Sequence, residues 1–149
     1  MCGISGIAAP QGQYAQPELV GRMMSILKHR GPSSASVVAS ATGEVAFGMR
    51  TLAIVSPGIE FGPFTDPTTG VIVTYNGEIY GYRGVAERLG VDIEPADTDG
   101  DFVLKAYLRL GTAFLSDVDG MFAIAIYDPR HAVTFLIRDG VGQNRSTTV

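Results

Sequence analysis

The stretch Met121–Asp128 reads MFAIAIYD, an almost unbroken apolar run. A strand that is apolar on both faces must be covered on both sides, as happens inside a layered domain. After Pro129-Arg130-His131, a second stretch, residues 132–139 (AVTFLIRD), predicts a partner strand joined by a short turn. The pair therefore favours a layered α/β or α+β domain.

The rest of the chain supplies further elements for such layers. Strands are predicted over residues 2–8, 45–54 and 71–75, and helices from Pro17 to before His29, over 82–89, and from Thr98 to before Gly111. Thr98 followed three residues later by Asp101 predicts a capping box. Asn76-Gly77 predicts a tight turn after the third strand, because both residues tolerate positive φ. Residues 56–70, with three prolines and three glycines, predict a loop, and residues 140–149 a polar tail.

Size and charge exclude several classes of protein. The 149 residues suffice for one domain with a real core. Eleven Lys and Arg against fifteen Asp and Glu give a net charge of −4, which offers no electrostatic footprint for nucleic acid or a membrane surface. No signal peptide or apolar run long enough to span a bilayer is evident. A single cysteine is consistent with a reducing compartment, so a cytoplasmic protein is expected.

That single cysteine, Cys2, directly follows the initiator methionine. Removal of Met1 would place a thiol and a free α-amino group on one residue. The amine, with a reference pKa of about 7.7–8.0, could accept the thiol proton and activate the nucleophile. The other interpretation is that a cysteine at this position is incidental, and position alone favours that second interpretation.

Several further motifs, in order along the chain, decide the question. The blocks are Met1-Cys2-Gly3-Ile4-Ser5-Gly6-Ile7, His29-Arg30-Gly31-Pro32, Arg50-Thr51-Leu52-Ala53-Ile54-Val55, Tyr75-Asn76-Gly77-Glu78-Ile79-Tyr80, Asp97-Thr98, Asp119-Gly120-Met121-Phe122-Ala123 and Arg138-Asp139. With these blocks the chain resembles the class II glutamine amidotransferases, which are N-terminal-nucleophile (Ntn) hydrolases. The sequences NGEIY and GMFAIAIYD are similar to those of the glutaminase domain of asparagine synthetase.

The resemblance implies a catalytic set of Cys2, Asn76 and Gly77 and no metal. Cys2 would attack the side-chain amide of glutamine and form a γ-glutamyl thioester. The Asn76 side-chain amide and the Gly77 N–H would stabilise the oxyanion. Without the resemblance, a turn after the strand is the better explanation of Asn76-Gly77.

Substrate binding is expected from Arg50, Glu78 and Asp97. Arg50 would hold the substrate α-carboxylate through its planar guanidinium, whereas the alternative is a surface arginine at a strand end. The Glu78 backbone and the Asp97 carboxylate would receive the α-ammonium, although Asp97 could also be a carboxylate favoured by the helix dipole. Asp99 stands where the family carries Glu, a change expected to affect at most local packing.

The resemblance covers residues 2–139 and implies an α+β fold, a four-layer αββα sandwich of antiparallel sheets lacking its last strands. The ATP-using synthetase domain is absent from the sequence, so no cofactor is expected in this chain, and ATP and Mg²⁺ would belong to that domain. The expected activity is hydrolysis of glutamine, by a domain that either stands alone or delivers ammonia to a separate synthetase subunit as its partner. The alternatives are a truncated, inactive asparagine synthetase fragment and a non-catalytic interaction module.

Overall fold

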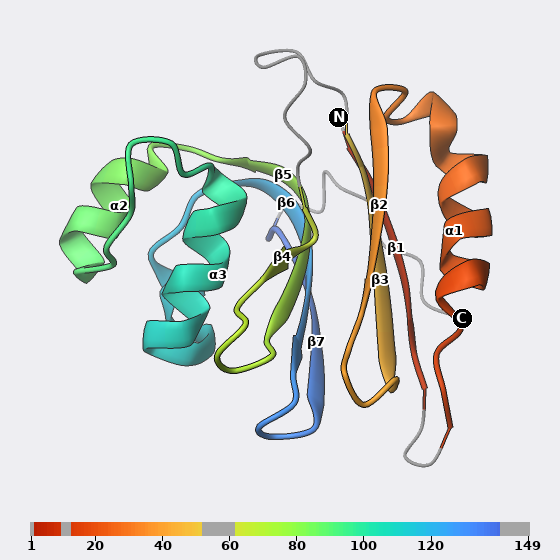
Figure 1. Ribbon diagram of the computed structural model, residues 1–149. Coiled ribbons are helices and arrows are strands. Elements are labelled where there is room, and N and C mark those ends of the chain that lie inside the picture. Colours follow the sequence, from red (N-terminus) through yellow and green to blue (C-terminus); the bar gives the residue numbers. More distant parts are fainter. Residues whose placement is uncertain (1, 10–12, 52–61, 141–149) are drawn as a thin grey trace.

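The computed structural model describes residues 2–9, 13–51 and 62–140, and it contains two antiparallel sheets (Figure 1). Sheet A has the order β1-β3-β2, and sheet B has the order β4-β5-β6-β7. The strands are β1 (Gly3–Ala8), β2 (Ser34–Ala39), β3 (Val45–Thr51), β4 (Phe64–Thr65), β5 (Ile72–Ile79), β6 (Gly120–Asp128) and β7 (Val133–Arg138). The helices are α1 (Pro17–Ile26), α2 (Tyr82–Leu89) and α3 (Asp99–Leu110), with 3-10 turns η1 (Leu27–His29) and η2 (Gly111–Ser116).

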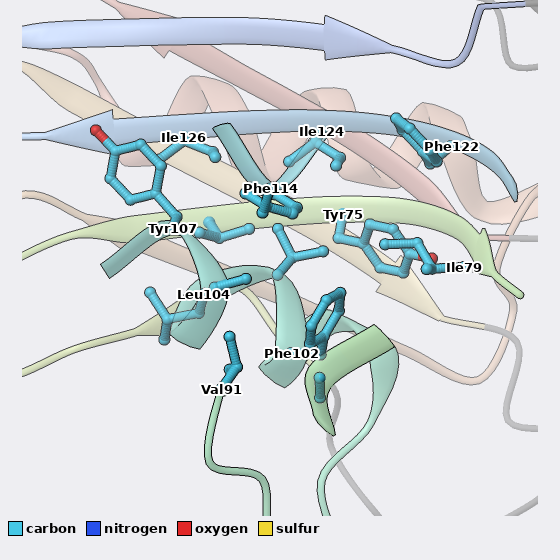
Figure 2. Close-up of a cluster of buried hydrophobic side chains, with 14 of the residues drawn as sticks. Tyr75, Ile79, Val91, Phe102, Leu104, Tyr107, Phe114, Phe122, Ile124 and Ile126 are labelled. Atoms are coloured by element: carbon cyan, nitrogen blue, oxygen red, sulfur yellow. The ribbon is translucent and has the colours of Figure 1, made fainter. Parts of the chain in front are cut away.

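The elements form four layers. Helix α1 packs on sheet A, sheet A faces sheet B, and α3, with α2 beside it, covers the outer face of sheet B (Figure 1). Three apolar clusters fill the spaces between these layers. The largest lies between sheet B and the helices and includes Phe102, Phe114 and Ile126 (Figure 2). The observed architecture is the αββα sandwich of antiparallel sheets that the resemblance implied.

Alternation along strand β3 defines the two faces of sheet A. Ala46 packs in the cluster beneath α1, whereas its neighbours Val45 and Phe47 pack in the cluster between the sheets. A Cβ on Gly48 would meet Met24 and Val20 of α1. Since successive side chains alternate, even-numbered residues of β3 face α1 and odd-numbered residues face sheet B.

Most of the expected elements are confirmed, and two are not. The first is the predicted tight turn at Asn76-Gly77, which is wrong, because both residues lie inside β5 and pair with Ala123 and Phe122 of β6. The second is the predicted loop over residues 56–70, since Phe64 and Thr65 form the short strand β4. Strand β2 was not predicted at all. Residues 52–54 of an expected strand, residues 56–61 and the tail 141–149 lie outside the described residues.

The first turn of α3 is fixed by two sets of contacts. The predicted capping box is present, with the Thr98 side chain accepting from the Asp101 N–H and the Asp101 carboxylate accepting from the Thr98 N–H. Gly100, the second residue of the helix, is buried against the ring of Phe64, and a Cβ on Gly100 would lie 2.2 Å from that ring. These contacts position Asp99, the first residue of the helix, against the edge of sheet B.

A buried carboxylate fixes the hairpin between β6 and β7 to α3. Asp128 accepts hydrogen bonds from the Tyr107 hydroxyl at 2.9 Å and from the guanidinium of Arg130 at 2.9 and 2.7 Å. The Arg130 contact, outweighing burial and joined by His131 and Tyr107, holds the pKa of Asp128 well below its ordinary value.

We expect Asp128→Asn to lower the free energy of unfolding by about 2 kcal/mol at pH 7, because these donors lose a charged acceptor. The folded-state pKa lies below the unfolded-state value of about 3.9, so the stabilisation is complete above that value and is lost as the pH falls through the folded-state pKa. Denaturant titrations at neutral and acidic pH would show the gap to wild type closing in acid. The exposed Asp117→Asn change is the control, and an equal gap at both pH values would contradict the assignment.

Candidate active site

Cys2 immediately precedes β1 and lies at the end of sheet A that adjoins β5. Its thiol is free and half-buried. The next residue, Gly3, pairs with Arg50, and a Cβ on Gly3 would meet Leu27 and Arg30 on the α1 side. Because adjacent side chains alternate, Cys2 is directed to the opposite face, toward sheet B. Strand β1 contacts β5 directly.

The end of β5 carries the other predicted catalytic residues. Asn76 is buried at 7% exposure on the same face of sheet B as Ile72 and Thr74, the face toward sheet A. Gly77 and Glu78 are exposed. The structure thus places Cys2 and the Asn76-Gly77 pair at the same end of the two facing sheets.

The hydrogen bonding of Phe122 shows which way the Gly77 N–H points. Phe122 donates its N–H to the Asp139 carboxylate at 3.1 Å, and its carbonyl accepts from the Asp139 N–H at 3.0 Å. Both polar groups of Phe122 are therefore turned toward β7. In an antiparallel pair, opposite residues exchange both backbone hydrogen bonds or neither, so Gly77 opposite Phe122 has its N–H turned away from β6.

On that outer side, the Gly77 N–H faces an edge of β5 that no strand among the described residues pairs with at this position. Strand β4 pairs there only with Ile72 and Val73. Ile79, two residues after Gly77, donates its N–H on the same side, to the Asp99 carboxylate at 3.2 Å. The Gly77 N–H and Asp99 thus lie along one edge of β5, near the start of α3.

Arg50 lies on the other face of sheet A. Its Nε donates to the Gly31 carbonyl at 2.6 Å, and its Nη1 donates to the Met24 carbonyl at 3.1 Å. Gly31 itself packs on β3, since a Cβ there would lie 2.8 Å from the backbone nitrogen of Thr51. Arg50 therefore anchors the segment after α1 to β3, and the structure does not direct it toward Cys2. Its predicted contact with a substrate carboxylate stays a prediction.

Asp97 is engaged in contacts of its own at the entry to α3. Its Oδ2 forms an ion pair with the Lys105 ammonium at 2.5 Å and accepts from the Glu94 N–H at 2.7 Å. Burial raises the pKa of Asp97, but these hydrogen bonds and the charges of Lys105 and Arg83 outweigh it, so the pKa is lowered overall. Asp97 thus stabilises the loop before α3, and its predicted role toward a substrate ammonium is untested.

Asp99 is the acidic residue that the structure adds to the site. Its Oδ2 accepts from the Tyr75 hydroxyl at 2.6 Å and from the Ile79 N–H at 3.2 Å. Burial, followed by the charges of Asp99, Glu78 and Cys2, raises the pKa of Tyr75 far above its ordinary value. The position of Asp99 at the start of α3 could have been predicted from the capping box, because a helix capped at Thr98 begins with Asp99.

Two kinds of feature are absent from the described residues. None of the helices placed by the structure is both long and apolar enough to cross a bilayer. Within residues 2–9, 13–51 and 62–140, no group of three or more His, Cys, Asp or Glu is arranged to hold a metal ion.

Sequence comparisons match the chain along almost its whole length. A family model described as the glutamine amidotransferase domain matches residues 1–145. The chain is 31% identical over 145 residues to asparagine synthetase [glutamine-hydrolyzing] 2 of Bacillus subtilis, covering 95% of this chain and 19% of that protein. It is 29% identical over 143 residues to asparagine synthetase [glutamine-hydrolyzing] of Asparagus officinalis, covering 95% and 24%. The chain thus spans only about a fifth to a quarter of the length of these relatives.

The fold has a counterpart among solved structures. Glutamine phosphoribosylpyrophosphate amidotransferase from B. subtilis superimposes with a TM-score of 0.63 at 16% identity, covering 85% of this chain and 34% of that one. At that identity the likeness concerns the fold alone. Together with the family model, it shows that the chain belongs to the glutamine amidotransferase domain family, has the Ntn-hydrolase fold and resembles asparagine synthetases within that family.

Proposed function

We propose that this chain hydrolyses glutamine to glutamate and ammonia, with Cys2 as the nucleophile. The observation that carries the proposal is the orientation of Gly77, whose N–H is turned away from β6, toward the part of the β5 edge with which β4 does not pair. An N–H in that position can stabilise an oxyanion without losing a sheet hydrogen bond. Cys2 directly precedes β1, a strand of the facing sheet that contacts β5, and Asn76 lies beside Gly77.

The proposed chemistry needs no group beyond the chain, glutamine and water. After removal of Met1, the α-amino group of Cys2 takes the thiol proton, and Sγ attacks the amide carbon of glutamine. The carbonyl oxygen becomes an oxyanion held by the Asn76 amide and the Gly77 N–H. The C–N bond then breaks, the proton passes to the leaving nitrogen, and ammonia departs. Water attacks the thioester, releasing glutamate and restoring the thiol.

For the substrate ammonium group we propose Asp99 in place of Asp97. Asp99 lies along the edge of β5 to which the Gly77 N–H opens, and Tyr75, its hydrogen-bond partner, directly precedes Asn76 on that strand. Asp97 is neutralised by Lys105. The exposed Glu78, next to Gly77, is proposed to contribute its backbone to the same ammonium group.

The wider reaction also remains a proposal. The relatives are named asparagine synthetases, and this chain covers only a minor part of their length. We propose that the ammonia is delivered to a synthetase unit, where ATP and Mg²⁺ would act, and that the glutaminase step itself uses neither.

The direct test combines product release with labelling of the thiol. Purified protein lacking Met1 should release glutamate from glutamine and should gain one equivalent of a diazoketone analogue of glutamine, located on Cys2 by peptide mass spectrometry. Excess glutamine should protect against labelling. A folded protein that keeps Met1 or an acetylated N-terminus, or whose thiol does not react, would refute the proposal.

A further inference from the structure

We propose that Tyr75 is a positioning residue that aims the Asp99 carboxylate at the α-ammonium group of the substrate, and so determines selectivity for α-amino acids. The inference rests on the proposed function for its choice of ligand. It is carried by the hydrogen bond from the Tyr75 hydroxyl to Asp99 Oδ2, at 2.6 Å.

Both donors to Asp99 converge on one of its oxygens. The Tyr75 hydroxyl and the Ile79 N–H donate to Oδ2, and within the described part of the chain Oδ1 receives no hydrogen bond. Two donors on one oxygen fix the rotation of the carboxylate plane. The remaining oxygen is then held ready for an external cation.

Tyr75 can impose that direction because its ring is immobilised by packing. It is 3% exposed and belongs to the apolar cluster between β5 and α3, at the same end as Ile79 (Figure 2). Asp99 is restrained independently, since it follows the Thr98 cap and precedes Gly100, which packs on Phe64. A rigid donor and a fixed backbone leave the Asp99 side chain with little rotational freedom, so the hydroxyl determines its direction.

The test compares L-glutamate with glutarate, which differ only in the α-ammonium group and are not turned over. Calorimetric titration of the wild-type chain should show tighter binding of L-glutamate. In Tyr75→Phe, the dissociation constant for L-glutamate should rise about tenfold while that for glutarate stays unchanged, because the lost bond is to a charged group. In an Asp99→Asn background, adding Tyr75→Phe should change neither constant further.

Tyr107→Phe provides a matched control. It removes another tyrosine–aspartate hydrogen bond, to Asp128, from the same helix–sheet layer. This variant should keep the wild-type selectivity even if its stability falls. Equal weakening of both ligands in Tyr75→Phe, unchanged selectivity, or a wild type that does not prefer L-glutamate would overturn the inference. A wild type that shows the preference, with its loss in Tyr75→Phe, but releases no glutamate from glutamine would refute only the proposed function.

Discussion

Replacing Cys2 with alanine is expected to reduce glutamate release from glutamine by about four orders of magnitude or more, because no covalent intermediate can form. The fold should be unaffected. Cys2 precedes β1, contributes no ladder pair to sheet A and is only half-buried. Activity would be measured as glutamate produced per active chain, and stability by thermal unfolding of the same samples.

A serine at the same position tests whether the thiol itself is required. Cys2→Ser replaces the thiol with a hydroxyl of similar size beside the same amine, but an alcohol is a far weaker nucleophile at neutral pH than a thiol. Both variants should still bind glutamine, since the residues proposed to hold the substrate are unchanged. An alanine variant that retains a substantial fraction of the wild-type rate would show that another group performs the attack.

The fold was predictable from the sequence to the extent that burial and capping determine it. The apolar run of β6 required cover on both faces, and the observed sandwich provides it. The capping box at Thr98 gave the start of α3 correctly. Strand β2, in contrast, is a half-buried edge strand of small residues, Ser34–Ala39, and its pattern carries little signal.

The site was less predictable because it depends on register. Arg50 and Cys2 fall on opposite faces only because Gly3 pairs with Arg50, and no local pattern specifies that pairing. Likewise, Asp97 and Asp99 are two acidic residues separated by the cap, and only the tertiary contacts assign one to Lys105 and the other to Tyr75. Residue types that predict a chemistry therefore do not reveal which of two neighbours performs it.

Gly77→Ala is the second substitution with a large expected effect, and its origin is steric. A Cβ at Gly77 would lie 2.2 Å from the carbonyl oxygen of Met121 and 2.6 Å from the Cα of Phe122. Both are backbone atoms of the paired strand β6, so no side-chain rotation relieves the overlap and the strands must separate locally. We expect a loss of about 3 kcal/mol in the free energy of unfolding. We also expect kcat to fall by a factor of about 10²–10³, because the Gly77 N–H is displaced from the position in which it faces the oxyanion.

Gly84→Ala is the matched control, since it adds the same methyl group to α2, where nothing lies within 4 Å of the new carbon. That change should stabilise the protein by about 0.5–1 kcal/mol through helix propensity and leave kcat unaltered. The comparison distinguishes two kinds of glycine. At position 77, contact with the backbone of β6 leaves no room for a side chain, whereas position 84 has room for one. If Gly77→Ala lowered stability but kept the wild-type kcat, Gly77 would serve only the close approach of β5 and β6, and the oxyanion would be stabilised by other donors.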